Sequence, residues 1–130
     1  MNSFSKNIYI EFLLNYPDLI FENESYDELL LLNITNFNNA KIGNLVVLTL
    51  EDNSIWIQNH FENSAYSIDN FEELKYILNN IFKDSILWVI ANKNKIWFET
   101  TLINNVSQIE KEPNVTYEVF SWSGKNDHIL

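Results

Sequence analysis

Few side chains of this sequence could take part in catalysis, and they stand in no recognised pattern. The imidazoles are those of His60 and His128, and there is no cysteine. A nucleophilic triad needs a histidine that an acid orients, but His128 stands beside Asp127 in a stretch that we expect to fray. A metal site can be drawn from His60, Glu62 and Asp69, although no pair among them has a known ligand spacing. We therefore expect neither an enzyme nor a metal site.

Paired carboxylates and glycine-rich loops offer no better candidate. Glu72 and Glu73 resemble the acid pair of a glycosidase, but adjacent residues of a helix point in different directions. Gly43 and Gly124 are the only glycines, so no glycine-rich loop can hold a phosphate. All 8 basic residues are lysines, whereas phosphate recognition needs positive charge and favours arginine. We expect no cofactor and no nucleic-acid partner.

The four tryptophans all lie in stretches that we predict to be strands. They could form a ligand cage or a carbohydrate platform, but strand aromatics more often belong to the core, and we expect this of at least two of the four. Trp56 and Trp97, on the return strands of two predicted hairpins, are the better candidates for partial exposure. The full set is Trp56, Trp88, Trp97 and Trp122.

Acidic residues are the most informative set, because the 130-residue chain has a formal net charge of −10. They fall into three clusters: Glu22, Glu24, Asp27 and Glu28; Glu51 and Asp52; and Glu62, Asp69, Glu72 and Glu73. This charge could serve solubility alone, or it could steer a basic protein onto the surface, with aromatic side chains as anchors. We favour recognition. The expected partner-binding residues are Asp69, Glu72, Glu73, Glu51, Asp52, Trp56 and Trp97.

One helix can be read directly from the sequence. Asp69-Asn70-Phe71-Glu72 has the spacing of a capping box, so the helix begins at Asp69 or Asn70, and it ends near Lys83. Apolar residues then recur at steps of three and four, which predicts one buried stripe. The stripe consists of Phe71, Leu74, Ile77, Leu78 and Ile81.

Two hairpins flank this helix. Residues 45–50 and 55–57 form the first, and residues 86–91 and 96–98 form the second, each around a polar turn that suits Asn or Asp. The hairpins align without gaps, which a duplication would explain, but no similar helix precedes the first one, so we favour convergence. A last strand is expected at 115–122.

The first forty residues are ambiguous. Residues 8–14 could be a helix or a strand that Pro17 ends, and 30–37 alternates as a strand does. Because 45–50 and 86–91 are apolar on both faces, something must cover the second face, and an N-terminal helix is the natural candidate. We predict a single α+β domain over 1–130, with a mostly antiparallel β-sheet of about five or six strands. The 69–83 helix should pack on the sheet that contains both hairpins.

No secretory signal and no apolar run of about 20 residues is present, so we expect a cytoplasmic protein. Abundant Asn, Ile and Lys with no Arg indicates an AT-rich bacterial source. In size and character the chain resembles the immunity proteins of bacterial toxin systems, including contact-dependent inhibition. That resemblance implies an inhibitor that occludes the active site of a cognate toxin, often a basic nuclease. The alternatives are an adaptor that pairs through an edge strand and a small-molecule-binding domain lined by Tyr and Trp.

Overall fold

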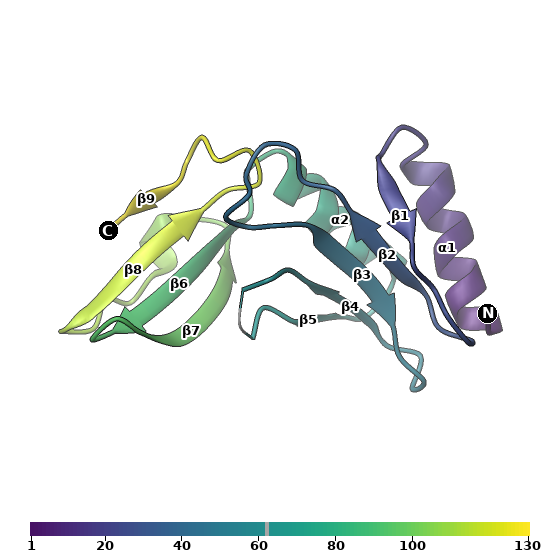
Figure 1. Cartoon of the computed structure of the whole chain (residues 1–130), viewed down its shortest axis with the longest axis horizontal. Helices are drawn as coiled ribbons and strands as arrows, with labels where there is room; N and C mark the ends of the chain where they lie inside the picture. Colours follow the sequence, from purple (N-terminus) through teal and green to yellow (C-terminus); the bar gives the residue numbers. More distant parts are fainter. Residues whose placement is uncertain (62) are drawn as a thin grey trace.

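The described part of the chain forms two antiparallel sheets and two α-helices (Figure 1). The structure is a computed structural model that describes residues 1–61 and 63–130, except for the side chain of Phe98. The α+β class with mostly antiparallel sheet is confirmed. One of the two sheets has five strands with helices packed on it, as predicted, and the described residues form a second sheet of four strands that was not expected.

The first sheet has five strands, and each strand pairs with the next one along the chain. The predicted 45–50 and 55–57 hairpin is confirmed as its centre, and the predicted strand 30–37 is present but shorter. The strands are β1 (Phe21–Asn23), β2 (Leu31–Ile34), β3 (Leu45–Thr49), β4 (Ile55–Gln58) and β5 (Tyr66–Ile68).

The second sheet has the order β7-β6-β8-β9 and contains the second predicted hairpin. Its turn is tighter than expected, because Asn94 and Lys95 both have positive φ (54° and 64°), as a two-residue type I′ turn requires. The two hairpins do not share a sheet, since β4 already pairs with β5 and β6 with β8. The strands are β6 (Leu87–Lys93), β7 (Ile96–Ile103), β8 (Val115–Phe120) and β9 (His128–Ile129).

Both helices cover the same face of the five-stranded sheet. The ambiguous 8–14 segment is part of α1 (Ser3–Asn15), and the predicted second helix is confirmed as α2 (Phe71–Phe82). In α1, the Ser5 hydroxyl shares a buried hydrogen bond of 2.6 Å with the hydroxyl of Thr49 in β3. Just beyond α1, the Tyr16 hydroxyl donates to Asn79 Oδ1 of α2 at 2.8 Å. The N-terminal helix therefore does not cover the second face of the central strands.

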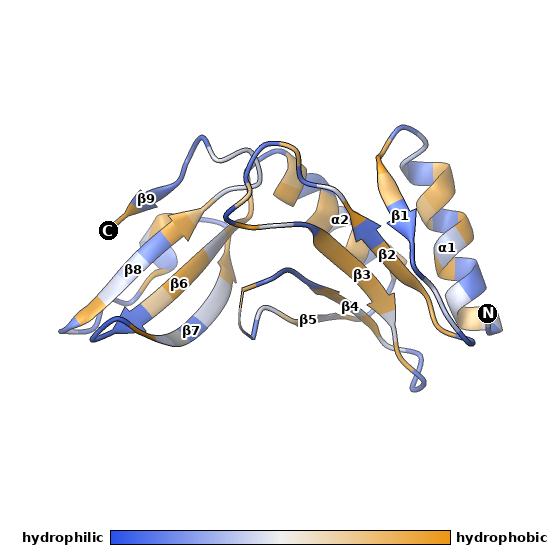
Figure 2. Ribbon diagram, viewed as in Figure 1, coloured by the Kyte–Doolittle hydropathy of each residue, from blue (hydrophilic) through white to orange (hydrophobic). Residues whose placement is uncertain are grey.

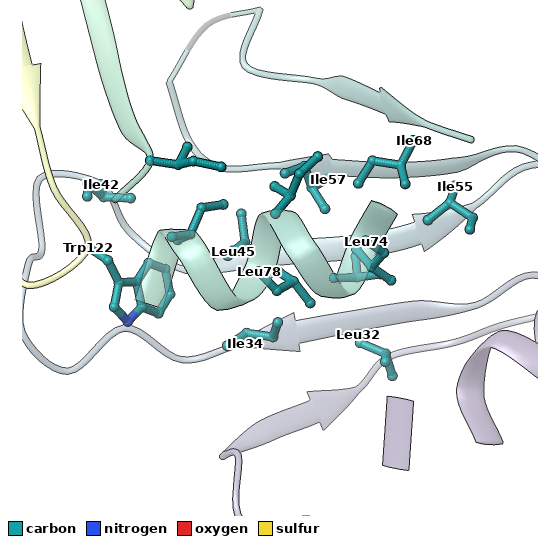
Figure 3. Close-up of a cluster of buried hydrophobic side chains, with 14 of the residues drawn as sticks. Leu32, Ile34, Ile42, Leu45, Ile55, Ile57, Ile68, Leu74, Leu78 and Trp122 are labelled. Carbon is teal, nitrogen blue, oxygen red and sulfur yellow. The ribbon is translucent and has the colours of Figure 1, made fainter. Parts of the chain in front are cut away.

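The main core lies between α2 and the five-stranded sheet. Leu74 and Leu78 are fully buried against β2, β3 and β4, as Figure 3 shows, and Ile77 and Ile81 are buried beside them. The burial of all four residues was predicted. Residues of the second sheet and of the segment between β8 and β9 join the same cluster, so the core spans both sheets. They are Trp88, Ile90, Phe120 and Trp122.

A smaller cluster explains why the central strand of the second sheet is apolar on both faces. Leu87, Val89 and Ala91 of β6 point away from the main core and pack with Tyr117 and Val119. Val106 and Ile109 cover them from the segment that contains the 3₁₀ helix Val106–Gln108. The 106–109 segment, and not the expected N-terminal helix, therefore covers the second face of β6.

Polar contacts join loops of the first sheet and the end of α2 to the segment that follows β8. The buried Asn39 amide donates to the carbonyl of Ser121 at 2.8 Å and to the carboxylate of Asp127 at 2.9 Å. The Asp84 carboxylate, just after α2, accepts from the backbone N–H and the hydroxyl of Ser123 at 3.0 and 2.6 Å. These bonds join the 35–44 loop and the end of α2 to the 121–127 segment.

Candidate functional site

The acidic residues at the start of α2 are organised by the helix cap. Asn70, which has extended backbone, accepts the N–H of Glu73 on its side chain at 2.9 Å. Glu73 Oε2 in turn accepts the N–H of Asp69 at 3.0 Å. Asn70 rather than Asp69 is therefore the cap. Asp69 and Glu72 are exposed, whereas Glu73 is half-buried.

Glu51 and Asp52 are exposed at the turn between β3 and β4. The Asp52 carboxylate accepts both the hydroxyl and the backbone N–H of Ser54. The hydroxyl bond is the main cause that lowers the pKa of Asp52 below its ordinary value. Asn53 has a positive φ of 60°. The turn therefore holds a negative charge in a defined geometry.

Strand register brings the acidic clusters to one end of the five-stranded sheet. Thr49 pairs with Ile55, and Ile55 pairs with Ile68, so the β3–β4 turn and the start of α2 leave the sheet at the same end. β2 starts there as well, because Leu31 pairs with Leu48. We define the acidic end as Asp27, Glu28, Glu51, Asp52, Asp69, Glu72 and Glu73.

Contacts in the 24–30 connection support this convergence. Asp27, Glu28 and Glu51 line one pocket together with Tyr26, so the first and second acidic clusters adjoin. The sequence showed these clusters as separate runs, and only the pairing of the strands unites them. Glu62, which we assigned to the third cluster, lies outside the described residues.

Trp56 lies beside the acidic end on the face of the sheet that no described helix covers. Its indole N–H donates to the Ser54 hydroxyl at 2.8 Å, and Ser54 also contacts Asp52. The register places Leu48 and Leu31 in a row with Trp56, and all three are half-buried. Figure 2 shows apolar residues along β2 and β3 with α2 behind the sheet. We call this surface the open face; it consists of Leu31, Asn33, Val46, Leu48, Trp56 and Gln58.

Trp97 does not join this group. It belongs to β7 of the second sheet, where it is half-buried, packs against the main core and donates to the Thr100 hydroxyl at 2.9 Å. The expected partial exposure of Trp56 and Trp97 is confirmed, as is the burial of Trp88 and Trp122. The structure therefore joins one of the two proposed anchors to the acidic end.

Sequence reasoning missed a cleft of about 340 Å³ between α2 and the 102–108 segment. Tyr66 of β5 and Tyr76 of α2 line it, together with Glu73 of the acidic end. No local pattern reveals this cleft, because its residues come from four separate segments. Tyr76 lies outside the buried stripe of the helix, so nothing in the sequence distinguishes it from any other exposed residue.

The histidines lie apart from these features. His60 is exposed, with its ring close above Gly43, where a β-carbon would collide with Nδ1. His128 is exposed in β9, and its Nδ1 forms a hydrogen bond with the Asn126 carbonyl. In the part of the chain that the structure describes, no three His, Asp or Glu residues are grouped as metal ligands would be.

Comparison with known proteins adds no assignment. No family model, curated protein or solved structure matches this chain. Within residues 1–61 and 63–130, no helix is long and apolar enough to cross a membrane. A functional assignment therefore depends on the acidic end, the open face and the cleft.

Proposed function

We propose that this chain is a cytoplasmic inhibitor that binds a basic protein domain, as the immunity proteins of bacterial toxin systems do. One observation carries the proposal: strand pairing gathers separate acidic segments at one end of a sheet, directly beside the open face that contains Trp56. The acidic end and the open face together form the binding surface. It acts by covering the active site of the partner.

The acidic end supplies long-range attraction. Glu51, Asp52, Asp69 and Glu72 are exposed, and such carboxylates accelerate the encounter with a basic partner more than they strengthen the final complex. Their field is screened beyond a Debye length of about 8 Å at physiological ionic strength. Association should therefore slow as salt rises, whereas dissociation should change little.

The open face supplies the short-range contact. Leu31, Leu48 and Trp56 are half-buried, and neither core cluster includes any of them. An apolar row next to a charged rim is the usual composition of a protein interface, in which tryptophan often contributes most. Trp56 is also held in place by its bond to Ser54, so binding costs little side-chain entropy.

A charge-reversal experiment tests the electrostatic part. The probe is the toxin domain encoded by the neighbouring reading frame, used in a co-expression protection assay and in surface binding kinetics. Glu51→Lys with Glu72→Lys should slow association about tenfold at low salt and weaken protection. The matched control is Glu110→Lys with Glu112→Lys, which makes the same change of charge at exposed positions near the second sheet. Equal effects of both pairs, or none, would contradict a dedicated acidic end.

A tryptophan substitution tests the open face with the same partner. Trp56→Ala should cost about 2 kcal/mol of binding, which corresponds to about thirtyfold faster dissociation. Trp97→Ala is the comparison, because it removes the other half-buried tryptophan from the second sheet. Faster dissociation for Trp97→Ala alone would place the anchor on the second sheet instead.

A further inference from the structure

The cleft between α2 and the 102–108 segment combines apolar, aromatic and acidic side chains. Ile77 and Ile86 line it and are 6% and 5% exposed, so its base belongs to the apolar interior. Tyr66 and Tyr76 also line it and are 41% and 59% exposed. Of the described residues that line the cleft, the only charged one is Glu73. Asn104 and Gln108 line it as well, and the Gln108 side-chain oxygen accepts the backbone N–H groups of Asn104 and Asn105. The cleft thus combines aliphatic and aromatic walls with two neutral amide side chains and a single negative charge.

The Glu73 carboxylate can accept further hydrogen bonds from a ligand. One of its oxygens, Oε2, accepts the N–H of Asp69 at 3.0 Å, but a carboxylate has about four acceptor positions on two oxygens. The bond to Asp69 fixes the carboxylate at the first turn of α2, which lowers the entropy that a ligand would have to remove. A half-buried carboxylate beside apolar walls also attracts a cation more strongly than an exposed one does.

We propose that this cleft binds an arginine side chain of the protein partner. The aliphatic stem of the arginine lies on Ile77 and Ile86, and its guanidinium group contacts Glu73 and the tyrosine rings. This inference rests on the proposed function, since it names the side chain by which a basic partner would be recognised. Glu73 belongs both to the acidic end and to the cleft, so the pocket continues the binding surface around the start of α2.

The lining favours arginine over other occupants. A guanidinium is planar, stacks on aromatic rings and loses less hydration than an ammonium, which suits a cleft with an apolar base. An anionic ligand would be repelled by Glu73, which no lysine in the described lining offsets. A purely apolar ligand would desolvate the Glu73 carboxylate and leave it only the Asp69 N–H as a partner.

The test uses the purified full-length chain and a small probe. N-acetyl-arginine amide is titrated while amide shifts are followed by ¹H–¹⁵N NMR, with the lysine and norleucine derivatives as comparisons. We expect saturable shifts at Tyr66, Tyr76 and Ile77 with the arginine probe, and at least threefold weaker binding of the other two. Equal binding of norleucine would overturn the proposal, as would shifts confined to the pocket around Tyr26 and Glu28.

Two neighbouring glutamates provide a matched pair of variants. Glu73→Gln removes the charge but keeps an oxygen that can accept from Asp69, so the helix cap survives. Glu72→Gln makes the same change at an exposed position one residue away. The arginine affinity should fall at least fivefold for Glu73→Gln and change less than twofold for Glu72→Gln. An unchanged affinity for Glu73→Gln, in a protein with an unchanged amide spectrum elsewhere, would refute the role of the cleft.

The cleft proposal and the proposed function can be refuted independently. If the arginine probe does not bind but the charge reversal of Glu51 and Glu72 still slows association of the toxin domain, the cleft proposal fails and the proposed function stands. If the probe binds as expected but no toxin domain associates, the cleft remains an arginine site and the inhibitor function is wrong. Each result therefore addresses one of the two proposals.

Discussion

Leu78 offers the most direct test of how the core is built. It is fully buried in the middle of α2, facing the five-stranded sheet (Figure 3). Leu78→Ala removes three carbon atoms, which at about 0.8 kcal/mol each amounts to about 2.4 kcal/mol of lost transfer free energy. A residual cavity of about 50 Å³ would add about 1.2 kcal/mol at about 24 cal/mol per Å³. We expect the free energy of unfolding to fall by about 3.5 kcal/mol.

The measurement is urea unfolding followed by tryptophan fluorescence, with tryptophans in both sheets as reporters. The control is Tyr76→Ala, because Tyr76 lies on the same helix and is 59% exposed. That variant should change the free energy of unfolding by about 0.5 kcal/mol or less. A loss below about 1 kcal/mol for Leu78→Ala, with an unchanged denaturant slope, would refute the packing of α2 on the sheet as described.

Three further predictions concern individual side chains. Asn70→Ala should destabilise the protein by about 0.5–2 kcal/mol in urea unfolding, and Asp69→Ala by less, because Asn70 is the cap of α2. Ser54→Ala should raise the pKa of Asp52, measured by NMR titration, because the Ser54 hydroxyl bond is the main cause that lowers it. Burial raises the pKa of Tyr16 from 10.0 to about 12, so the folded state holds this proton more tightly than the unfolded state. Stability should therefore fall as pH rises from about 10 towards 12, and the Tyr16→Phe variant should lose less over that range; an equal loss in both would contradict this.

The elements that could be predicted are those whose signal is local. In α2, the apolar stripe and the cap both occur within one short segment, so the helix and its buried face could be predicted together. α1 could not be identified in this way, because Ile10 and Leu14 are apolar yet 45% and 72% exposed, which obscures the buried side marked by Ile8 and Phe12. Its cap, Asn2, precedes Ile8 by more than a helical turn.

The arrangement into two sheets depends on contacts between distant segments. The apolar pattern of β6 correctly indicated burial on both faces, but not what covers the second face. That role belongs to isolated apolar residues, Val106 and Ile109, in a segment with little regular structure. No periodic pattern marks such a segment, so a helix was the more reasonable expectation.

In the candidate site, too, single residues could be predicted from the sequence, whereas contacts between distant segments could not. Charge and residue type identified Glu51, Asp52 and Trp56 from sequence, and Ser54 ties the last two together. The convergence of Glu28 with Glu51 required the register of β2 and β3. The cleft at Tyr66 and Tyr76 required the tertiary packing of α2, which no local pattern encodes.

The strand order also bears on how the chain folds. In the five-stranded sheet every neighbour follows in sequence, so each pairing closes only a short loop, which is the kind of contact that forms fastest. The bonds of Asn39 to Ser121 and Asp127 instead join residues that are 82 and 88 positions apart. The hairpins should therefore form early. The contacts of Asn39 with Ser121 and Asp127, which we call the joint between the two sheets, should form late, after the rate-limiting barrier. Interactions that form after the barrier slow unfolding without speeding folding, so the joint should lengthen the lifetime of the folded state.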